Sequence, residues 1–242
     1  MRRGKPFAVL DGEPPTEFVF AANKAARALG IETRMTRLQA EFFSKLVIVP
    51  RKPDVEAAAC TALHAIACLF SPRIEVIEEW PGTFALDIQG MNVLFGDPSQ
   101  LANKLQQAIQ AAGFLPHVAV AENFHAAVCL ACGEPGVCVV PVGCEADALR
   151  SLPLRVLNLE PQHAERFSAS GISTCGELAA LPVTDLIARI GQTGKKLHAL
   201  ARGEWPHLMF PIEPSFEDGL VERMELDFPI DDWNGCCSCF RA

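Results

Sequence analysis

The chain has 242 residues, half of them hydrophobic, and a formal net charge of −8. This length predicts one large domain or two modest ones, and the apolar share is enough for a packed core. Because the net charge is negative, the composition excludes a protein that binds nucleic acid over its whole surface, and any contact with nucleic acid is expected to be local.

The termini and the hydropathy suggest where the protein works. No apolar run in the sequence reaches the roughly 18 residues needed to span a membrane. The N-terminus, MRRGKPFAVLDGEPP, has basic residues, but only a very short apolar run follows them, so it is a poor signal peptide. We therefore expect a cytoplasmic protein without membrane contact.

The first 150 residues predict an α+β unit. Strands are expected where short apolar or alternating runs lie between turn residues, at FAVLD, 45–49, 74–77, 83–89, 117–121 and 137–140. Helices are expected at 21–30, at 35–43, from Pro53 to about 69, from Asp97-Pro98 to about 112, and at 123–131. This order is typical of helices packed on one face of a mostly antiparallel sheet.

The cysteines allow a metal site but do not favour one. Cys129 and Cys132 form a CxxC pair, and Cys138 and Cys144 follow, but a zinc site requires a second close pair. The segment AAVCLACG also has the pattern of a buried helix, in which cysteine acts as a small hydrophobic residue. Without a secretory signal, we expect reduced thiols. The C-terminal tail DDWNGCCSCFRA, with Cys236, Cys237 and Cys239, resembles nothing before it.

Beyond Leu152 the pattern changes to short helices and turns, and two glycine turns there each lead into a helix. GIST and IGQTG would expose backbone N–H groups at the positive end of a helix, which can bind phosphate. The two lysines after the second turn would add contacts to the DNA backbone without reading sequence. Ordinary glycine-punctuated helical hairpins remain the alternative. The candidate DNA-binding residues are Gly171, Ser173, Thr174, Gly191, Gly194, Lys195 and Lys196.

Four segments together resemble Y-family (DinB/UmuC-like) translesion DNA polymerases. Residues 152–204 resemble the thumb, FVFAANKAARALGIETRM the fingers motif, FSPRIEVIEEWPGTFALDIQGMNVLFG the palm hairpin, and HVAVAENFHAAVCLA the following palm segment. The resemblance covers roughly residues 4 to 230. Asn23 and the LDIQG…LFG pairing make it most similar to the ImuB branch, whose members carry the polymerase fold as noncatalytic adaptors.

The resemblance implies a domain organisation. Residues 1–150 would form a ferredoxin-like palm that lacks its first strand, with small helical fingers inserted at about 20–44. Residues 151–205 would form an all-α helix-hairpin-helix thumb. Residues 206–242 would be a linker and the truncated start of a little-finger domain, so the chain is expected to be truncated at both ends.

The resemblance also implies that the catalytic carboxylates are missing. Two-metal nucleotidyl transfer needs clustered carboxylates to hold both ions. In the family one Asp comes from the first palm strand, and an adjacent acidic pair comes from the hairpin, where this sequence has Gly82 and Thr83. Glu78 and Glu79 could substitute only by a shift of about four residues past a Pro-Gly turn that fixes the register. We expect no catalytic residue and no metal; Asp87 corresponds to the family's downstream aspartate.

The contacts to an incoming nucleotide are reduced as well. By resemblance, the fingers tyrosine is replaced by Lys24, the fingers arginine is kept as Arg27, and the palm lysine is replaced by Phe124. A triphosphate needs several positive charges or metal ions to bind. Lys24 and Arg27 are therefore expected to be the remnant of a nucleotide site.

The expected function is that of a noncatalytic DNA-binding adaptor in translesion synthesis and SOS mutagenesis. The resemblance implies primer-template DNA, a sliding clamp, an error-prone replicative-type polymerase and a RecA-like accessory as partners. Three alternatives remain: an active error-prone polymerase, which would need Mg²⁺; a simple helix-hairpin-helix DNA-binding module; and a nonfunctional fragment.

Overall fold

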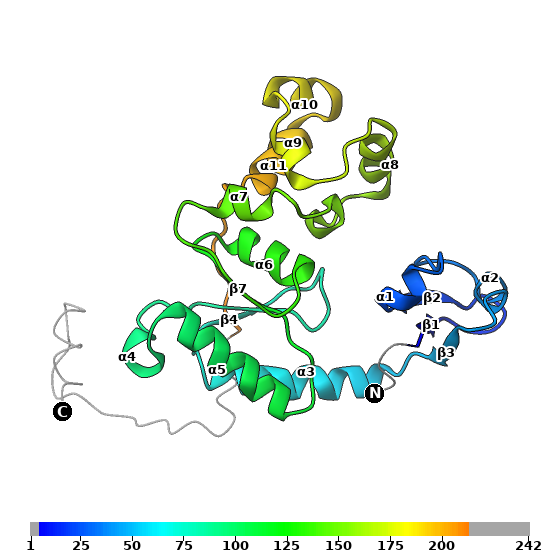
Figure 1. The fold of residues 1–242 in the computed structure, drawn as a ribbon, viewed down its shortest axis with the longest axis horizontal. Coiled ribbons are helices and arrows are strands. Elements are labelled where there is room, and N and C mark those ends of the chain that lie inside the picture. The colour runs from blue at the N-terminus through cyan, green and yellow to red at the C-terminus, as the bar shows by residue number, and fades with distance from the viewer. Residues whose placement is uncertain (1–4, 213–242) are drawn as a thin grey trace, which may run out of the picture.

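The computed structural model describes residues 5–212, whose buried apolar side chains form three clusters. An N-terminal unit lies at one end of the long helix α3, a mixed α/β unit surrounds the rest of that helix, and a helical unit stands above it (Figure 1). No helix among residues 5–212 is long and apolar enough to cross a membrane.

The N-terminal unit is a three-stranded sheet. Strand β1 (Phe7–Asp11) pairs antiparallel with β2 (Phe18–Ala22) and parallel with β3 (Val47–Pro50). Two short helices, α1 (Lys24–Arg27) and α2 (Arg37–Glu41), follow β2. The expected helix at 21–30 is wrong in its first residues, because the apolar run before them pairs with β1. The core of this unit consists of Ala8, Leu10, Val19, Ala26, Ile31 and Ala40.

Asn23 fixes the start of α1 against β1. Its Oδ1 accepts hydrogen bonds from the amides of Ala26 (2.9 Å) and Phe7 (3.1 Å), and its Nδ2 donates to the Lys5 carbonyl (2.8 Å). Asparagine is a favoured N-cap because its side chain satisfies an amide that the helix leaves unpaired. The residue that pointed to the ImuB branch therefore has a structural role here.

Arg51 joins the N-terminal unit to α3 (Pro53–Cys68). Its guanidinium forms ion pairs with Asp11 of β1 at 2.8 Å and with Glu56 of α3 at 2.9 Å, and it lies 4.0 Å from the centre of the Phe20 ring. Hydrogen bonding to Arg51 lowers the pKa of the Asp11 carboxyl. One side chain thus connects the sheet to the helix that follows it.

The α/β unit contains two separate two-stranded sheets. Strands β4 (Ile74–Val76) and β5 (Phe84–Leu86) form an antiparallel hairpin, whereas β6 (Val118–Val120) and β7 (Val137–Val139) pair in parallel. The prediction of one mostly antiparallel sheet is therefore wrong for residues 5–212, where no strand lies between β5 and β6 to join the pairs. The strands themselves were predicted at these places.

Helices pack around these strands. Helices α3 and α5 (Pro98–Ala111) bury Phe70, Leu101, Ala102 and Leu105 with Val118, and the short α4 (Asn92–Phe95) precedes α5. Helix α6 (Phe124–Gly133) follows β6 and is capped by Asn123. The predicted starts of α3, α5 and α6 are confirmed; α4 was not predicted.

The C-terminal half is helical, as expected. Its elements are α7 (Glu145–Leu149), a 3₁₀ turn (Leu154–Leu157), α8 (Pro161–Ala169), α9 (Cys175–Ala179), α10 (Val183–Ile190) and α11 (Gln192–Ala201). Leu149, Leu152, Leu178 and Leu186 of this half share one core with Ala126 and Leu130 of α6. The helical unit therefore packs directly on the α/β unit.

The segment after α11 returns to the α/β unit. The Ile212 amide donates to the Ile74 carbonyl at 2.7 Å, so this segment lies along the edge of β4. The rest of the expected linker, the expected start of a little-finger domain and the cysteine-rich tail lie outside the described residues.

Candidate functional site

The turn between α10 and α11 has the features of a phosphate-binding site. Gly191 has φ +66°, a conformation that favours glycine, and nothing lies within 4 Å of the position a Cβ would take. Among residues 5–212 the amides of Gln192 and Thr193 find no hydrogen-bond acceptor, and both residues are exposed. The first N–H groups of a helix attract anions when they are left unpaired.

Two exposed lysines follow this turn. Lys195 makes no ion pair among the described residues, and the Nζ of Lys196 lies 6.0 Å from the centre of the Trp205 ring. No ion pair among the described residues fixes the Lys195 side chain, whereas the Lys196 side chain points toward Trp205 in the segment after α11. These two lysines and the unpaired amides at the start of α11 together supply positive charge to the predicted interface.

Gly194 does not belong to that set. It is buried, and its amide donates to the Gly191 carbonyl at 3.0 Å. A Cβ at this position would lie 2.6 Å from the carbonyl oxygen of Leu186 in α10. The structure therefore gives Gly194 a packing role, in which the missing side chain lets two helices approach closely.

The turn before α9 has no amide left for a phosphate. Gly171 has the expected positive φ (+74°), but its N–H donates to Ser168. The carboxylate of Glu177 accepts the amides of Ser173 (2.7 Å) and Thr174 (3.0 Å) and the Ser173 hydroxyl (3.1 Å). Thr174 completes a capping box with Glu177.

Glu177 therefore stands where the prediction placed a phosphate group. The hydrogen bonds from Ser173 and Thr174 lower the pKa of its carboxyl, so this group is ionised at neutral pH. A negative charge that already occupies the donors repels a second anion. The sequence pattern S/T-x-x-E does signal a capping box, which could have shown that these donors are taken.

Hydrogen bonds at the turn of the β4–β5 hairpin fix its register. The amide of Thr83 donates to the Trp80 carbonyl, and its own carbonyl accepts from Ile77. Gly82 has φ +78°. Glu78 and Glu79 lie before the turn and are exposed. A shift that brought these acids to the positions of Gly82 and Thr83 would break these bonds and the whole pairing with β4.

Asp87 is engaged in local structure. Its Oδ2 forms an ion pair with Arg73 at 2.6 Å, and its Oδ1 accepts the Gln89 amide at 3.0 Å. Its carbonyl accepts a hydrogen bond from the buried Ser71. Asp87 thus fixes the end of the hairpin, and both of its carboxylate oxygens have protein partners.

The donor set does not fit the Mg²⁺ ions that a polymerase fold implies. Hard divalent cations require several clustered oxygen ligands, usually carboxylates. At the hairpin this chain offers Gly82 and Thr83, an aspartate paired with arginine, Glu75 bonded to His207, and the exposed Glu78 and Glu79 before the turn. Nowhere in residues 5–212 do three His, Cys, Asp or Glu side chains form a group that could hold a metal ion.

Lys24 and Arg27 lie on α1, and both are exposed without an ion pair in the described part of the chain. They remain open to an anionic ligand. Phe124 is the residue that the resemblance aligns with the family's palm lysine. Its ring stacks on His207 with centroids 3.6 Å apart. A stack of two aromatic rings therefore occupies the place where the resemblance expects a lysine.

Sequence reasoning missed the cluster around His207. Its Nε2 donates to both oxygens of Glu75 (2.9 and 3.0 Å), and Glu75 also accepts the amide of Phe210 (2.7 Å). His125 packs edge-on against His207 and Phe124. These residues are 75, 124–125 and 207–210 in the sequence, so only the fold brings them together. They attach the segment after α11 to the α/β unit.

The CxxC pair lies in a buried helix, as expected. Cys129 is buried in α6, and its Sγ donates to the Val156 carbonyl at 3.5 Å. Burial raises the pKa of Cys129 to about 12 and that of Cys175 to about 11. Both thiols stay protonated at neutral pH, which makes them poor nucleophiles and poor metal ligands.

Comparison with curated proteins returns DNA polymerases. The chain is 29% identical over 206 residues to DNA polymerase IV of Shewanella sp. (strain ANA-3), covering 83% of this chain and 57% of that protein. It is 33% identical over 205 residues to DNA polymerase IV 2 of Mesorhizobium japonicum, covering 82% and 48%. It therefore spans about half the length of these relatives.

Protein ImuB of Caulobacter vibrioides is a weaker match. It is 28% identical over 173 residues, covering 72% of this chain and 35% of that protein. The comparison thus favours DNA polymerase IV over the ImuB branch to which the chain was expected to be most similar.

Solved structures share the fold. DinB from Sulfolobus solfataricus aligns with a TM-score of 0.69 at 23% identity, covering 85% of this chain and 62% of that one. The insertion ternary complex of Dbh DNA polymerase aligns with a TM-score of 0.65 at the same identity and coverage. The impB/mucB/samB family model matches residues 1–131, more than half of the chain, so the chain belongs to this family and has the fold of Y-family DNA polymerases.

Proposed function

We propose that this protein holds primer-template DNA in translesion repair and does not add nucleotides itself. The observation that carries the proposal is the register of the hairpin turn, which the hydrogen bonds of Thr83 fix. By the resemblance, Gly82 and Thr83 take the positions of the family's acidic pair in that register. Without carboxylates there, two metal ions would lack the charge that holds them.

DNA binding would rest on the turn before α11. Its unpaired amides, Lys195 and Lys196 can contact phosphates without reading bases. The turn before α9 cannot take this role, because its amides already donate to Glu177. The proposed interface is therefore one helix-hairpin-helix turn rather than two, which predicts weak, salt-sensitive binding. One similar structure is named as a ternary complex of a DNA polymerase, which supports DNA as the ligand class.

The finer assignments belong to the same proposal. Residues 1–150 would serve as a palm with fingers at about 20–44, and residues 151–205 as the thumb. A noncatalytic protein of this kind would act as an adaptor for an error-prone polymerase, a sliding clamp and a RecA-like accessory. A plain helix-hairpin-helix module with an unrelated first half is not supported, because the family model matches residues 1–131.

Primer extension tests the central statement. The protein is mixed with a labelled primer on an intact or damaged template, with Mg²⁺ and all four nucleotides, and DNA binding is followed by fluorescence anisotropy in the same buffer. We expect binding without extension. Distributive extension that disappears in the Glu78→Gln, Glu79→Gln double variant would overturn the noncatalytic role.

An active error-prone polymerase is the second candidate function. It is favoured by the relatives, since the proteins at 29% and 33% identity are named DNA polymerase IV. If the wild-type protein extends the primer and the Glu78→Gln, Glu79→Gln variant still does so, the result would support an active polymerase whose metal-binding carboxylates are other residues. The same assay therefore separates the two candidates.

A further inference from the structure

A pocket of about 300 Å³ lies where the helical unit meets the α/β unit. Its wall is formed by β4 and the hairpin turn, by the start of α6, by the turn before α8 and by α11. These elements come from both units, which Figure 1 shows one above the other, so only the fold creates this junction pocket. Its volume is at the lower end of the range of about 300–1,000 Å³ that is typical of small-ligand sites.

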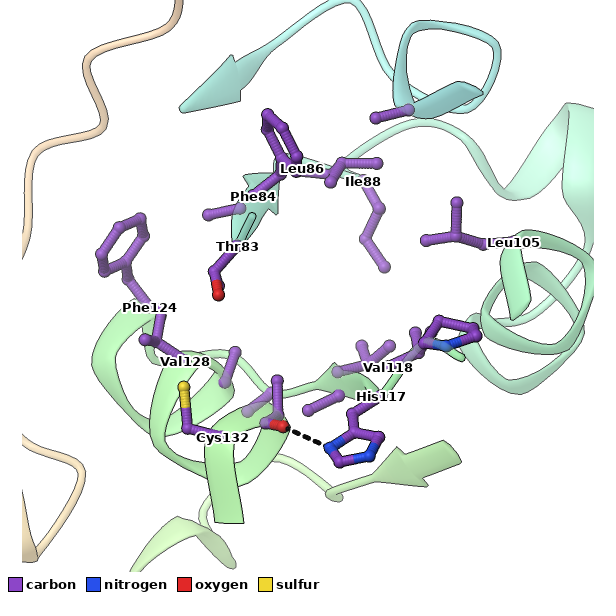
Figure 2. Close-up of a pocket in the computed structure, with 18 of the residues that line it drawn as sticks. Thr83, Phe84, Leu86, Ile88, Leu105, His117, Val118, Phe124, Val128 and Cys132 are labelled. Atoms are coloured by element: carbon purple, nitrogen blue, oxygen red, sulfur yellow. Dashed lines mark hydrogen bonds between the residues drawn. The ribbon is translucent and has the colours of Figure 1, made fainter. Parts of the chain in front are cut away.

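The larger cavity beside it has its polar groups satisfied. This second cavity, of about 630 Å³, is lined mainly by apolar side chains such as Leu86 and Val118 (Figure 2). His117 at its wall hydrogen-bonds the Ala131 carbonyl at 3.2 Å. None of its lining residues, within the described chain, has a buried side-chain nitrogen or oxygen without a partner. Phe124 lines both cavities, so the two are neighbours with different chemistry.

The junction pocket differs because two histidines in its wall lack partners. His163, in the first turn of α8, is 8% exposed, and its Nδ1 has no hydrogen-bond partner within residues 5–212. The Nε2 of His125, in the first turn of α6, is also buried without a partner there. Buried polar atoms in folded proteins are nearly always hydrogen-bonded. Two orphan nitrogens at one small pocket therefore point to polar atoms that a ligand supplies.

The polar groups of the wall suit the edge of a nucleobase. Burial lowers the pKa of His125, so its ring is neutral at neutral pH and has one donor and one acceptor. The Thr193 hydroxyl and the Asn158 side-chain amide, which also line the pocket, each offer both as well. Base edges present mixed donors and acceptors. Trp80 adds an aromatic ring to the wall, on which a base can stack.

The pocket adjoins the phosphate-binding turn before α11. Thr193 and Lys196 line the pocket, and both belong to that turn and the helix it opens. The amides of Gln192 and Thr193 are unpaired in the described part of the chain. A phosphate held by these amides therefore lies beside the pocket, and the base of the same nucleotide can enter it.

Two carboxylates in the wall predict which bases fit. Glu79 and Glu160 line the pocket. Carboxylates repel phosphate but accept hydrogen bonds from the exocyclic amino groups of adenine and cytosine. Thymine has a carbonyl oxygen in place of that amino group, so two acceptors would meet. The pocket should therefore favour adenine or cytosine over thymine.

We propose that the junction pocket receives one unpaired base of the DNA strand whose phosphate is bound at the turn before α11. This inference rests on the proposed function, because it starts from the phosphate contact at that turn. A base can present its hydrogen-bonding edge to a protein pocket only after it has left the duplex, and the cost of leaving is least for a base without a partner. The pocket therefore directs the protein to DNA that carries an unpaired nucleotide.

Fluorescence anisotropy with four labelled primer-templates tests the proposal. One is fully paired, and the other three have a single nucleotide inserted in the primer strand: an unpaired adenine, an unpaired thymine or an abasic site. The abasic duplex keeps the phosphates and lacks the base. We expect the adenine duplex to bind about tenfold more tightly than the abasic one, which is the effect of one stacked base, and the thymine duplex to lie between them.

Two variants and a matched control locate the effect. His163→Phe keeps an aromatic ring in α8 but removes both ring nitrogens, so it should reduce the preference for adenine over the abasic site about threefold. Trp80→Ala removes the stacking surface and should abolish the preference. His117→Phe makes the same change as His163→Phe at the neighbouring cavity and should leave the preference unaltered. Binding of the fully paired duplex should stay the same in all three; if either pocket variant fails to fold, the other decides.

The outcomes separate this inference from the proposed function. If no duplex binds, both fail. If the paired duplex binds but the adenine and abasic duplexes have equal affinity, the inference alone fails. It also fails if folded His163→Phe and Trp80→Ala variants keep the full preference. Free dAMP that binds the wild-type protein as tightly as the adenine duplex does would overturn a DNA base as the ligand and assign the pocket to a free nucleotide.

Discussion

Replacing Lys195 and Lys196 with alanine tests the interface at α11 quantitatively. Each lysine that neutralises a DNA phosphate contributes about 0.9 to the slope of log affinity against log salt. Loss of both should therefore reduce that slope by about 1.8. Between 50 and 200 mM salt, the wild-type protein should then lose about twelvefold more affinity than the double variant.

The single variants should differ. Lys195 is exposed and has no partner in the described residues, so its loss should remove the full contribution of one phosphate contact. The ammonium group of Lys196 lies 6.0 Å from the centre of the Trp205 ring, so its contribution to the slope should be smaller. Both positions are on the surface, and the free energy of unfolding should change by less than about 0.5 kcal/mol.

Fluorescence anisotropy with a labelled primer-template at four or more salt concentrations measures these slopes. Lys104→Ala is the matched control, because it removes the same charge from α5, where the ammonium donates to the Phe95 carbonyl at 3.0 Å. An unchanged slope in the double variant, or an equal change in Lys104→Ala, would show that DNA does not bind at this turn.

Three further predictions follow from the described contacts. Glu177→Gln keeps the shape of the capping residue but removes its charge, so it should lower the thermal midpoint and raise DNA affinity, measured by melting and by anisotropy. Alkylation with iodoacetamide at pH 8, read by peptide mass spectrometry, should label the exposed Cys144 well before Cys129, whose pKa burial raises to about 12. The pKa of His125 is lowered by burial and then by the charges of His207 and Lys196. Below about pH 6.5 the His125 side chain therefore binds a proton in the unfolded state more readily than in the folded state. The free energy of unfolding should fall as the pH drops, and it should fall less in the His125→Phe variant. Equal labelling of both cysteines, or identical pH profiles of the urea midpoint, would contradict the respective reasoning.

Local signals in the sequence predicted the helices of the α/β unit. Pro53, the Asp97-Pro98 pair and Asn123 each mark a helix start through a fixed φ or a capping side chain, and the structure begins α3, α5 and α6 there. Such signals act within a few residues of one another. They therefore survive whatever tertiary arrangement surrounds them.

The pairing of strands could not be predicted in the same way. Residues 21 and 22 were predicted to begin a helix, yet their pairing with β1 makes them part of a strand. The separation of the sheets depends on whether a strand lies between β5 and β6, which no local pattern encodes. The cluster of Glu75, Phe124 and His207 likewise depends on contacts across more than 80 positions of sequence.

At the candidate site, the sequence predicted the backbone conformation and exposure of residues better than it predicted which of them are available to bind a phosphate. Lys195, Gly191 and Gly171 have the exposure or backbone conformation that the glycine turns predicted. Gly194 and Thr174 do not have the expected availability, since one packs against α10 and the other is bonded to Glu177. A glycine turn shows that the chain comes close to something, but only the fold shows whether this is a phosphate or another helix.

The N-terminal sheet has a hydrophobic core of its own, connected to the remainder through Arg51 and α3. A unit of this kind can open while the other two remain folded, so unfolding of this chain should proceed in more than one cooperative step. The free energies of unfolding predicted above for Lys195, Lys196 and His125 would then refer to the α/β and helical units, and the N-terminal unit would have a value of its own. Proteolysis and hydrogen exchange would report separate values for residues 5–50 and for the α/β and helical units, which share a packed boundary.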